Sequence, residues 1–250
     1  MTVNVQNISN TKPRELMRNL SSFIAPAILA IGTLFMVGCE SEDAKKISNA
    51  QNCLDHATSS TVSECTDIVS GMTSKESYHI RCSAHYISQG FTGARFASAF
   101  EQLKSSGSSV DPMTTAMAFM AFNSQTEADT TLSDCTASGV QSLLRMSTLT
   151  SLATVVASAS ANNLLPSVGT TGLTATQMQT AIQNLINTPS ASTNQTIGTI
   201  AISAQAAYCN TGSSFATNEV CTNLNAAVNS GASAATIGAA LLTQLNTVSH

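Results

Sequence analysis

The sequence predicts an all-α protein in which disulfide-stapled helical hairpins form one or two small helical bundles, with little or no β-sheet. Apolar residues recur at three- and four-residue spacing along most of the chain, and no short segment alternates convincingly between apolar and polar side chains. Cysteines recur beside motifs that start helices. With 43 % hydrophobic residues among 250, the chain can bury a core, which excludes a disordered protein.

Charged residues are scarce, and this excludes one class of partner. Lys and Arg together number 10, the charged fraction is 10 %, and the formal net charge is −4. Proteins that bind nucleic acids carry clusters of basic residues that neutralise phosphates. We therefore expect no nucleic-acid partner.

An uncharged apolar run covers residues 22–37 and follows three basic residues, Lys12, Arg14 and Arg18. A basic start followed by about 15 apolar residues predicts a secretory signal peptide, here residues 1–38. The run is short for a membrane-spanning helix, which needs roughly 20 residues. Pro26 inside the run also disfavours a permanent helix.

The run ends at Met36-Val37-Gly38-Cys39. This stretch, together with the signal that begins at Met17, resembles the lipobox of bacterial lipoproteins. The resemblance covers residues 17–39 only. It implies that Cys39 receives a diacylglycerol and becomes the first residue of the mature chain, so that a lipid anchor links the protein to a membrane of the cell envelope. By the same resemblance, Glu40 after the cysteine favours the outer membrane; the face it occupies stays open.

Composition divides the expected mature chain into parts. Residues 39–46 (CESEDAKK) are charged and predict a short solvated tether. Residues 44–137 hold nearly all the remaining charges and most aromatic side chains, which predicts an N-terminal helical part with an aromatic core. Residues 138–250 predict a low-charge C-terminal helical part with a core of Ala, Leu, Ile and Val, because Glu219 is the only charged residue after 150.

Helix signals follow one another through the N-terminal part. Residues 47–57 carry apolar side chains at helical spacing. Capping boxes at 61–64 and 73–76 predict two helix starts. The aromatic spacing of 96–103 predicts another helix, and Asp111-Pro112 predicts a further start. Glycines suited to helix ends are Gly71 and Gly90.

The C-terminal part also predicts helices. A long helix is expected after Gly139, and a second begins at Thr174-Ala175-Thr176-Gln177 and ends before Pro189. Three more are expected from the apolar spacing around 197–204, 220–228 and 233–245. Residues 187–200 are rich in Thr and Asn, so a short strand there is an alternative.

Six cysteines remain after Cys39, and an even number in an exported chain predicts disulfides. They are Cys53, Cys65, Cys82, Cys135, Cys209 and Cys221. The motif TVSECT at 61–66 recurs as TLSDCT at 131–136 and more loosely as TNEVCT at 217–222. Each copy is expected to place its cysteine in the first turn of a helix, whereas the other three cysteines lie inside or near the end of the preceding helix.

A short loop between antiparallel helices brings two such cysteines together. A disulfide requires a Cα separation of about 5.5 Å. The spacing therefore predicts the pairs Cys53–Cys65 and Cys209–Cys221, which share one sequence separation. Cys82 then remains for Cys135, and that bridge would join the helices between the two hairpins.

Metal and catalytic sites have one candidate region. Cysteines and histidines of zinc-ligand type occur there at helical spacing, namely Cys53, His56, His79, Cys82 and His85. We interpret the cysteines as disulfides and the histidines as surface residues, and predict no metal and no cofactor. His79 or His85 with Ser83 is a weak candidate for nucleophilic catalysis, because no nucleophile elbow is present. We therefore predict no enzyme.

Two further features have both a functional and a structural interpretation. A Met and Phe stripe could line a pocket for an apolar ligand, although such stripes usually belong to a core. It comprises Met113, Met117, Met120, Phe119 and Phe122. Arg81 lies in a largely apolar helix and is expected to pair with Asp55 or Asp67.

These features together predict a lipid-anchored cell-envelope protein with a binding or scaffolding role and an envelope protein as partner. The specific role is open. One alternative is a carrier that holds a small apolar ligand in the Met and Phe region, and a weaker one is an envelope enzyme. The nearly uncharged C-terminal surface is either a plain hydrophilic surface or a face that packs against another protein.

Overall fold

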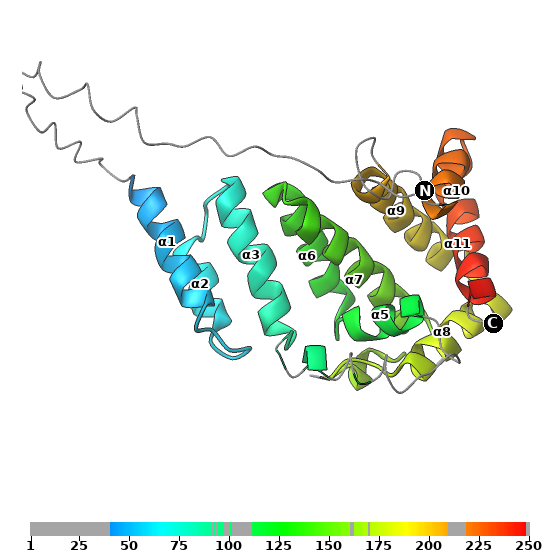
Figure 1. Ribbon diagram of the computed structural model, residues 1–250, viewed down its shortest axis with the longest axis horizontal. Coiled ribbons are helices and arrows are strands. Elements are labelled where there is room, and N and C mark those ends of the chain that lie inside the picture. Colours follow the sequence, from blue (N-terminus) through cyan, green and yellow to red (C-terminus); the bar gives the residue numbers. More distant parts are fainter. Residues whose placement is uncertain are drawn as a thin grey trace, which may run out of the picture. The chain divides into compact units, whose positions relative to one another are not determined.

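The structure is a computed structural model, and every regular element in the part it describes is helical (Figure 1). The described residues are 41–91, 93, 95–97, 101, 112–160, 163–169, 171–209 and 219–248. The predicted all-α class is therefore confirmed for these ranges. The predicted signal peptide, Cys39 and most of the predicted 96–103 helix lie outside the described residues.

The helices alternate with short connections. In chain order they are α1 (Glu42–Leu54), α2 (Val62–Ile68), α3 (Lys75–Ser88), α5 (Pro112–Met120), α6 (Gln125–Ser138), α7 (Gln141–Ala159), the 3-10 turn η1 (Leu165–Ser167), α8 (Ala175–Asn187), α9 (Ala191–Tyr208), α10 (Glu219–Asn229) and α11 (Ala234–Val248). No described helix is both long and apolar enough to cross a bilayer.

Side-chain caps set several helix starts, though not all of those expected. Thr174 and Gln177 form the predicted capping box of α8. The box at 61–64 is wrong, because the Thr61 hydroxyl accepts a hydrogen bond from the amide of Thr58 and makes no cap to α2. At 73–76 the start is shifted by one residue, since Ser74 is the cap and accepts from the amide of Ser77.

Two expectations about local structure are corrected. The tether expected at 39–46 is helical from Glu42, because Ser41 caps α1 and the acids Glu42 and Asp43 favour the positive end of the helix dipole. The strand alternative at 187–200 is wrong, because α9 covers most of that segment. Its Thr side chains face solvent and donate to carbonyls of their own helix, while Ile197 faces the core.

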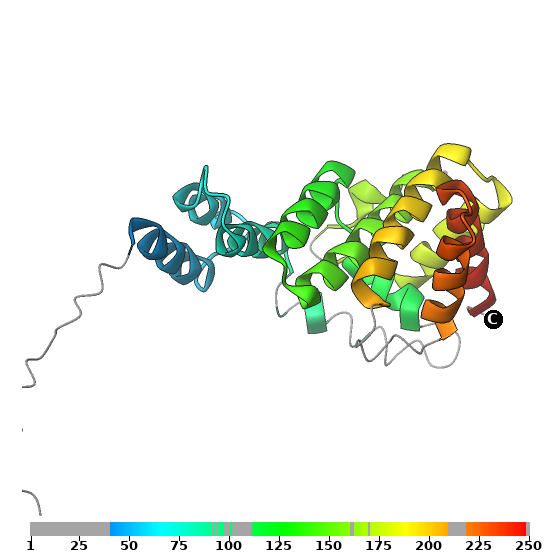
Figure 2. The same ribbon diagram turned by 90° about the horizontal axis from the view of Figure 1, so that it is seen from above.

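One main core spans the composition boundary near residue 138. It takes buried side chains from α3, α5, α6, α7, α8, α9 and α11. Helix α7 lies among α5, α6, α8 and α9, and α9 and α11 lie side by side (Figure 2). The change in composition therefore does not separate two cores.

The aromatic part of this core lies at the contact between α3 and α5. The rings of Tyr86 and Phe122 meet edge-on with centroids 5.4 Å apart, and Phe91 lies 5.3 Å from Phe119. Hydroxyls of α7 complete the contact. Thr154 accepts from the amide of Phe122, and Thr150 shares a hydrogen bond with the Tyr86 hydroxyl. The buried polar groups here are thus paired, as a core requires.

A second, much smaller core lies between α1, α2 and α3. Its fully buried members are only Ala50, Val69 and Ile80. Helices α1 and α2 pack against each other and against α3. Helix α3 is therefore shared, with one face in each core.

All three predicted disulfides are present. Cys53–Cys65 ties α1 to α2, Cys82–Cys135 ties α3 to α6, and Cys209–Cys221 ties α9 to α10, with Cα separations of 5.4, 5.0 and 5.3 Å. One positional expectation is wrong. Cys135 lies near the end of α6 rather than in a first turn, because α6 begins at Gln125 behind the cap Ser124.

Arg95 supports the aromatic part of the core from within. Its side chain is 1 % exposed, and its guanidinium donates to the carbonyl oxygens of Gln89, Phe119 and Ala121 at 2.7 Å. The guanidinium also lies 4.0 Å from the centre of the Phe91 ring. Burial lowers the pKa of Arg95 to about 10, so the group stays charged at neutral pH.

Replacing Arg95 by methionine is expected to lower the free energy of unfolding by about 2–3 kcal/mol. Methionine keeps apolar volume but leaves three main-chain oxygens without their donors. Urea denaturation followed by circular dichroism measures the effect. Lys45→Met on the exposed face of α1 is the control, and equal costs for the two variants would contradict a structural role for Arg95.

Candidate functional site

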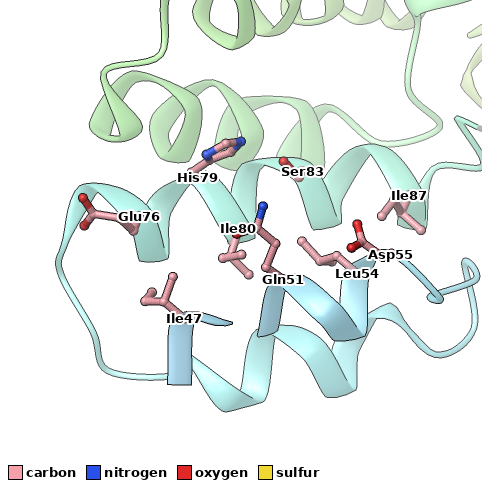
Figure 3. A pocket seen from close by; sticks show the side chains of 9 residues that line it. All are labelled: Ile47, Gln51, Leu54, Asp55, Glu76, His79, Ile80, Ser83 and Ile87. Atoms are coloured by element: carbon pink, nitrogen blue, oxygen red, sulfur yellow. The ribbon is translucent and has the colours of Figure 1, made fainter. Parts of the chain in front are cut away.

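A hollow of about 290 Å³ opens between α1 and α3 (Figure 3). We call it the α1–α3 groove. It is lined by Ile47, Gln51, Leu54, Asp55, Glu76, His79, Ile80, Ser83 and Ile87. The hollow combines an aliphatic floor with polar side chains at its rim.

The helical repeat explains why these residues meet. On α1, Ile47, Gln51 and Leu54 are separated by four and three positions, which places them on one face. On α3, Ile80 and Ile87 are seven positions apart and lie on the facing side. The two helices run in the same direction, so that Ile47 and Glu76 lie at one end of the groove and Asp55 and Ile87 at the other (Figure 3).

Carboxylates supply the formal charge of the rim. Asp55 is exposed on α1, and Glu76 is exposed in the first turn of α3. The pKa of Glu76 is held below its usual value of 4.5 by a hydrogen bond from its own backbone amide and by the Ser74 hydroxyl. The groove can therefore accept an aliphatic group together with a cation.

The serine–histidine candidate is only partly assembled. His79 and Ser83 both line the groove, one turn apart on α3 (Figure 3). A general base must be within hydrogen-bond reach of its nucleophile, but in the described residues no hydrogen bond joins these two side chains. His85, the other candidate base, lies on a different face of α3 and points towards α6.

His85 belongs to an ionic cluster that fastens α3 to α6. Its Nδ1 lies 3.1 Å from Glu127 Oε1, and its Nε2 lies 3.0 Å from Asp134 Oδ2. Arg81 lies 3.7 Å from Asp134 and donates to the carbonyl oxygens of Val69 and Met72. The expected partner of Arg81 on Asp55 or Asp67 is therefore wrong. Arg81 and His85 both act across the α3–α6 contact.

The metal hypothesis loses its thiolate ligands. Cys53 and Cys82 are both in disulfides, and a disulfide sulfur cannot act as the thiolate that zinc binds. Within the described ranges, no group of three or more His, Cys, Asp or Glu side chains could hold a metal ion.

The Met and Phe stripe belongs mainly to the core. Met117 and Phe122 have no exposed surface, and Met120 is 6 % exposed. Met113 is 43 % exposed, so the three methionines do not share one buried face. Phe119 is partly buried against the same core. The side chains expected to line a carrier pocket therefore fill space between helices.

The sequence did not single out the groove. Ile47 and Leu54 were expected only as helix core positions, and Glu76 only as a capping residue. The available signal is arithmetic: α1, α2 and the facing side of α3 carry more aliphatic residues than three short helices can enclose. That excess leaves Ile47, Leu54 and Ile87 half-buried.

The chain matches no protein-family model, and neither a curated protein nor a solved structure is similar to it. Inference about its function therefore depends on its own residues.

Proposed function

We propose that this chain is an exported, lipid-anchored protein of the bacterial cell envelope that works by binding another protein. Three disulfides in a chain of this length carry the proposal, because such bonds form and persist in oxidising compartments. The lipobox-like end of the signal at Cys39 supports the anchor, and Glu40 supports the outer membrane as its destination.

The anchor has a physical consequence for the folded part. Only Glu40 separates Cys39 from Ser41, the cap of α1. Consecutive Cα atoms lie about 3.8 Å apart, so a diacylglycerol on Cys39 keeps the start of α1 beside the membrane surface. Two acyl chains are enough for stable attachment.

The α1–α3 groove supports binding as the activity. Its aliphatic floor offers area that a partner can bury, and its two carboxylates offer polar contacts that fix the position of the partner. A binding or scaffolding role uses both features and needs no reacting group.

Replacing Cys39 by serine is expected to abolish lipid attachment and to leave the signal peptide uncleaved. Cells grown with an alkyne fatty acid, followed by fluorescent tagging of the purified protein, measure attachment, and mass spectrometry measures the length of the chain. The double variant Cys53→Ser/Cys65→Ser is the control and is expected to keep its label. An uncleaved, unlabelled wild-type protein with reactive thiols in the cytosol would contradict the proposal.

A further inference from the structure

The α1–α3 groove exposes aliphatic surface that the small core leaves uncovered. Ile47, Leu54 and Ile87 are all half-buried, whereas the small core fully encloses only three side chains. Helix α2 already occupies the other side of the α1–α3 pair. The uncovered aliphatic side chains therefore line the groove, and only a group from outside can bury them.

The dimensions of the groove match a helix. Ile47 and Leu54 are seven residues apart on α1, which is about 10 Å of helical rise. Glu76 and Ile87 are eleven residues apart on α3, about 16 Å. Side chains along two parallel helices form ridges into which the ridges of a third helix can pack. Three turns of a guest helix span this length.

Charge selects among possible guests. Asp55 and Glu76 lie at opposite ends of the groove, and the aliphatic side chains lie between them (Figure 3). No Lys or Arg is among the nine lining residues, and His79 is the one lining side chain that can become cationic. An acidic guest would meet two carboxylates, whereas a guest with a cation near each end would pair with them.

We propose that the α1–α3 groove binds an amphipathic α-helix of another envelope protein, with its aliphatic face on Leu54, Ile80 and Ile87 and a Lys or Arg beside both Asp55 and Glu76. This inference rests on the proposed binding function and names its partner class. The helix completes the small core, and the paired charges fix its register. Helix-in-groove recognition of this kind depends on anchors at helical spacing.

The test uses the whole mature protein and a synthetic probe. The probe is a fluorescent peptide of roughly 14 residues, about four helical turns, with leucines at helical spacing on one face and a lysine near each end. A matched probe carries glutamates in place of the lysines. Fluorescence anisotropy measures the Kd of each probe for the wild type and for Asp55→Lys/Glu76→Lys.

The expected result is that the lysine probe binds the wild type and binds the charge-reversed variant about tenfold or more weakly. The glutamate probe is expected to show the opposite preference, which a merely unfolded variant cannot do. Glu64→Lys/Asp67→Lys makes the same change of charge on α2, outside the groove, and is expected to leave the Kd of the lysine probe within about twofold.

A second variant tests the groove without altering either carboxylate. Ser83→Arg places a long side chain into the hollow and is expected to weaken the lysine probe about tenfold. No binding to the wild type, or equal binding to all variants, would overturn the inference. So would a wild-type dimer in analytical ultracentrifugation that Asp55→Lys/Glu76→Lys abolishes, because the occupant would then be a second copy. Fatty-acid labelling at Cys39 is a separate measurement, so failure of the anchor and failure of the groove are distinguishable.

Discussion

Gly198→Val is expected to lower the free energy of unfolding by more than about 4 kcal/mol, the largest effect of any single substitution argued from this structure. Helices α9 and α11 approach so closely that a Cβ atom at Gly198 would fall on the main-chain carbonyl of Ala234. Reciprocally, a Cβ at Gly238 would fall on the carbonyl of Asn194. Main-chain atoms cannot rotate away as a side chain can, so the helices must separate and expose Ile197 and Leu242.

Urea denaturation followed by far-ultraviolet circular dichroism measures this cost. Gly238→Ala tests the reciprocal contact with the smallest possible side chain and is expected to cost about 3 kcal/mol. The matched control is Gly93→Ala, because a Cβ there meets no atom within 4 Å. Its expected change is within about 0.5 kcal/mol. Similar stabilities for Gly198→Val and Gly93→Ala would show that α9 and α11 are not in backbone contact.

Local signals in the sequence predicted much of this fold. The capping box at Thr174 and the glycine end of α6 at Gly139 depend on residues within one helical turn, and both are present. The hairpin disulfides Cys53–Cys65 and Cys209–Cys221 were predictable because a short loop limits where each cysteine can be. Once these pairs are assigned, Cys82–Cys135 follows by elimination.

Signals that depend on tertiary contact were missed or misread. The hexapeptides at 61–66 and 131–136 are nearly identical, yet one begins α2 and the other lies within α6. Thr131 is fully buried there and its hydroxyl donates to the carbonyl of Glu127, so packing overrides the capping preference. The pairing of Arg81 with Asp134 joins positions 53 residues apart, and no local pattern specifies it.

The candidate site was hidden for a related reason. A helical pattern tells which residues share a face but not which faces find a cover. Ile47 and Leu54 have the same spacing as core residues, and only the placement of α2 and α3 shows that part of their surface remains open. The glycines at 198 and 238 did carry a signal, because glycine inside a helix costs stability unless a close approach requires it.

Removing the Cys82–Cys135 disulfide is expected to lower the free energy of unfolding by about 4 kcal/mol, against about 3 kcal/mol for either hairpin disulfide. Cys82–Cys135 closes a loop with a sequence separation of 53, whereas the hairpin bridges close loops of 12. In the chain-entropy account, the longer loop restricts the unfolded chain more. The measurement is urea denaturation of Cys82→Ala/Cys135→Ala, with Cys53→Ala/Cys65→Ala as the matched control.

Burial predicts a second difference between the same two bonds. Cys82 and Cys135 have no exposed surface, while Cys53 is partly exposed. A reductant added to the native protein should therefore open Cys53–Cys65 first, and mass spectrometry of alkylated peptides follows the order. The contacts of His85 and Arg81 with Asp134 also hold α3 against α6 and hinder access. Earlier alkylation of Cys82 than of Cys53, or equal costs for the two double variants, would show that this bridge does not fasten the α3–α6 contact as the structure indicates.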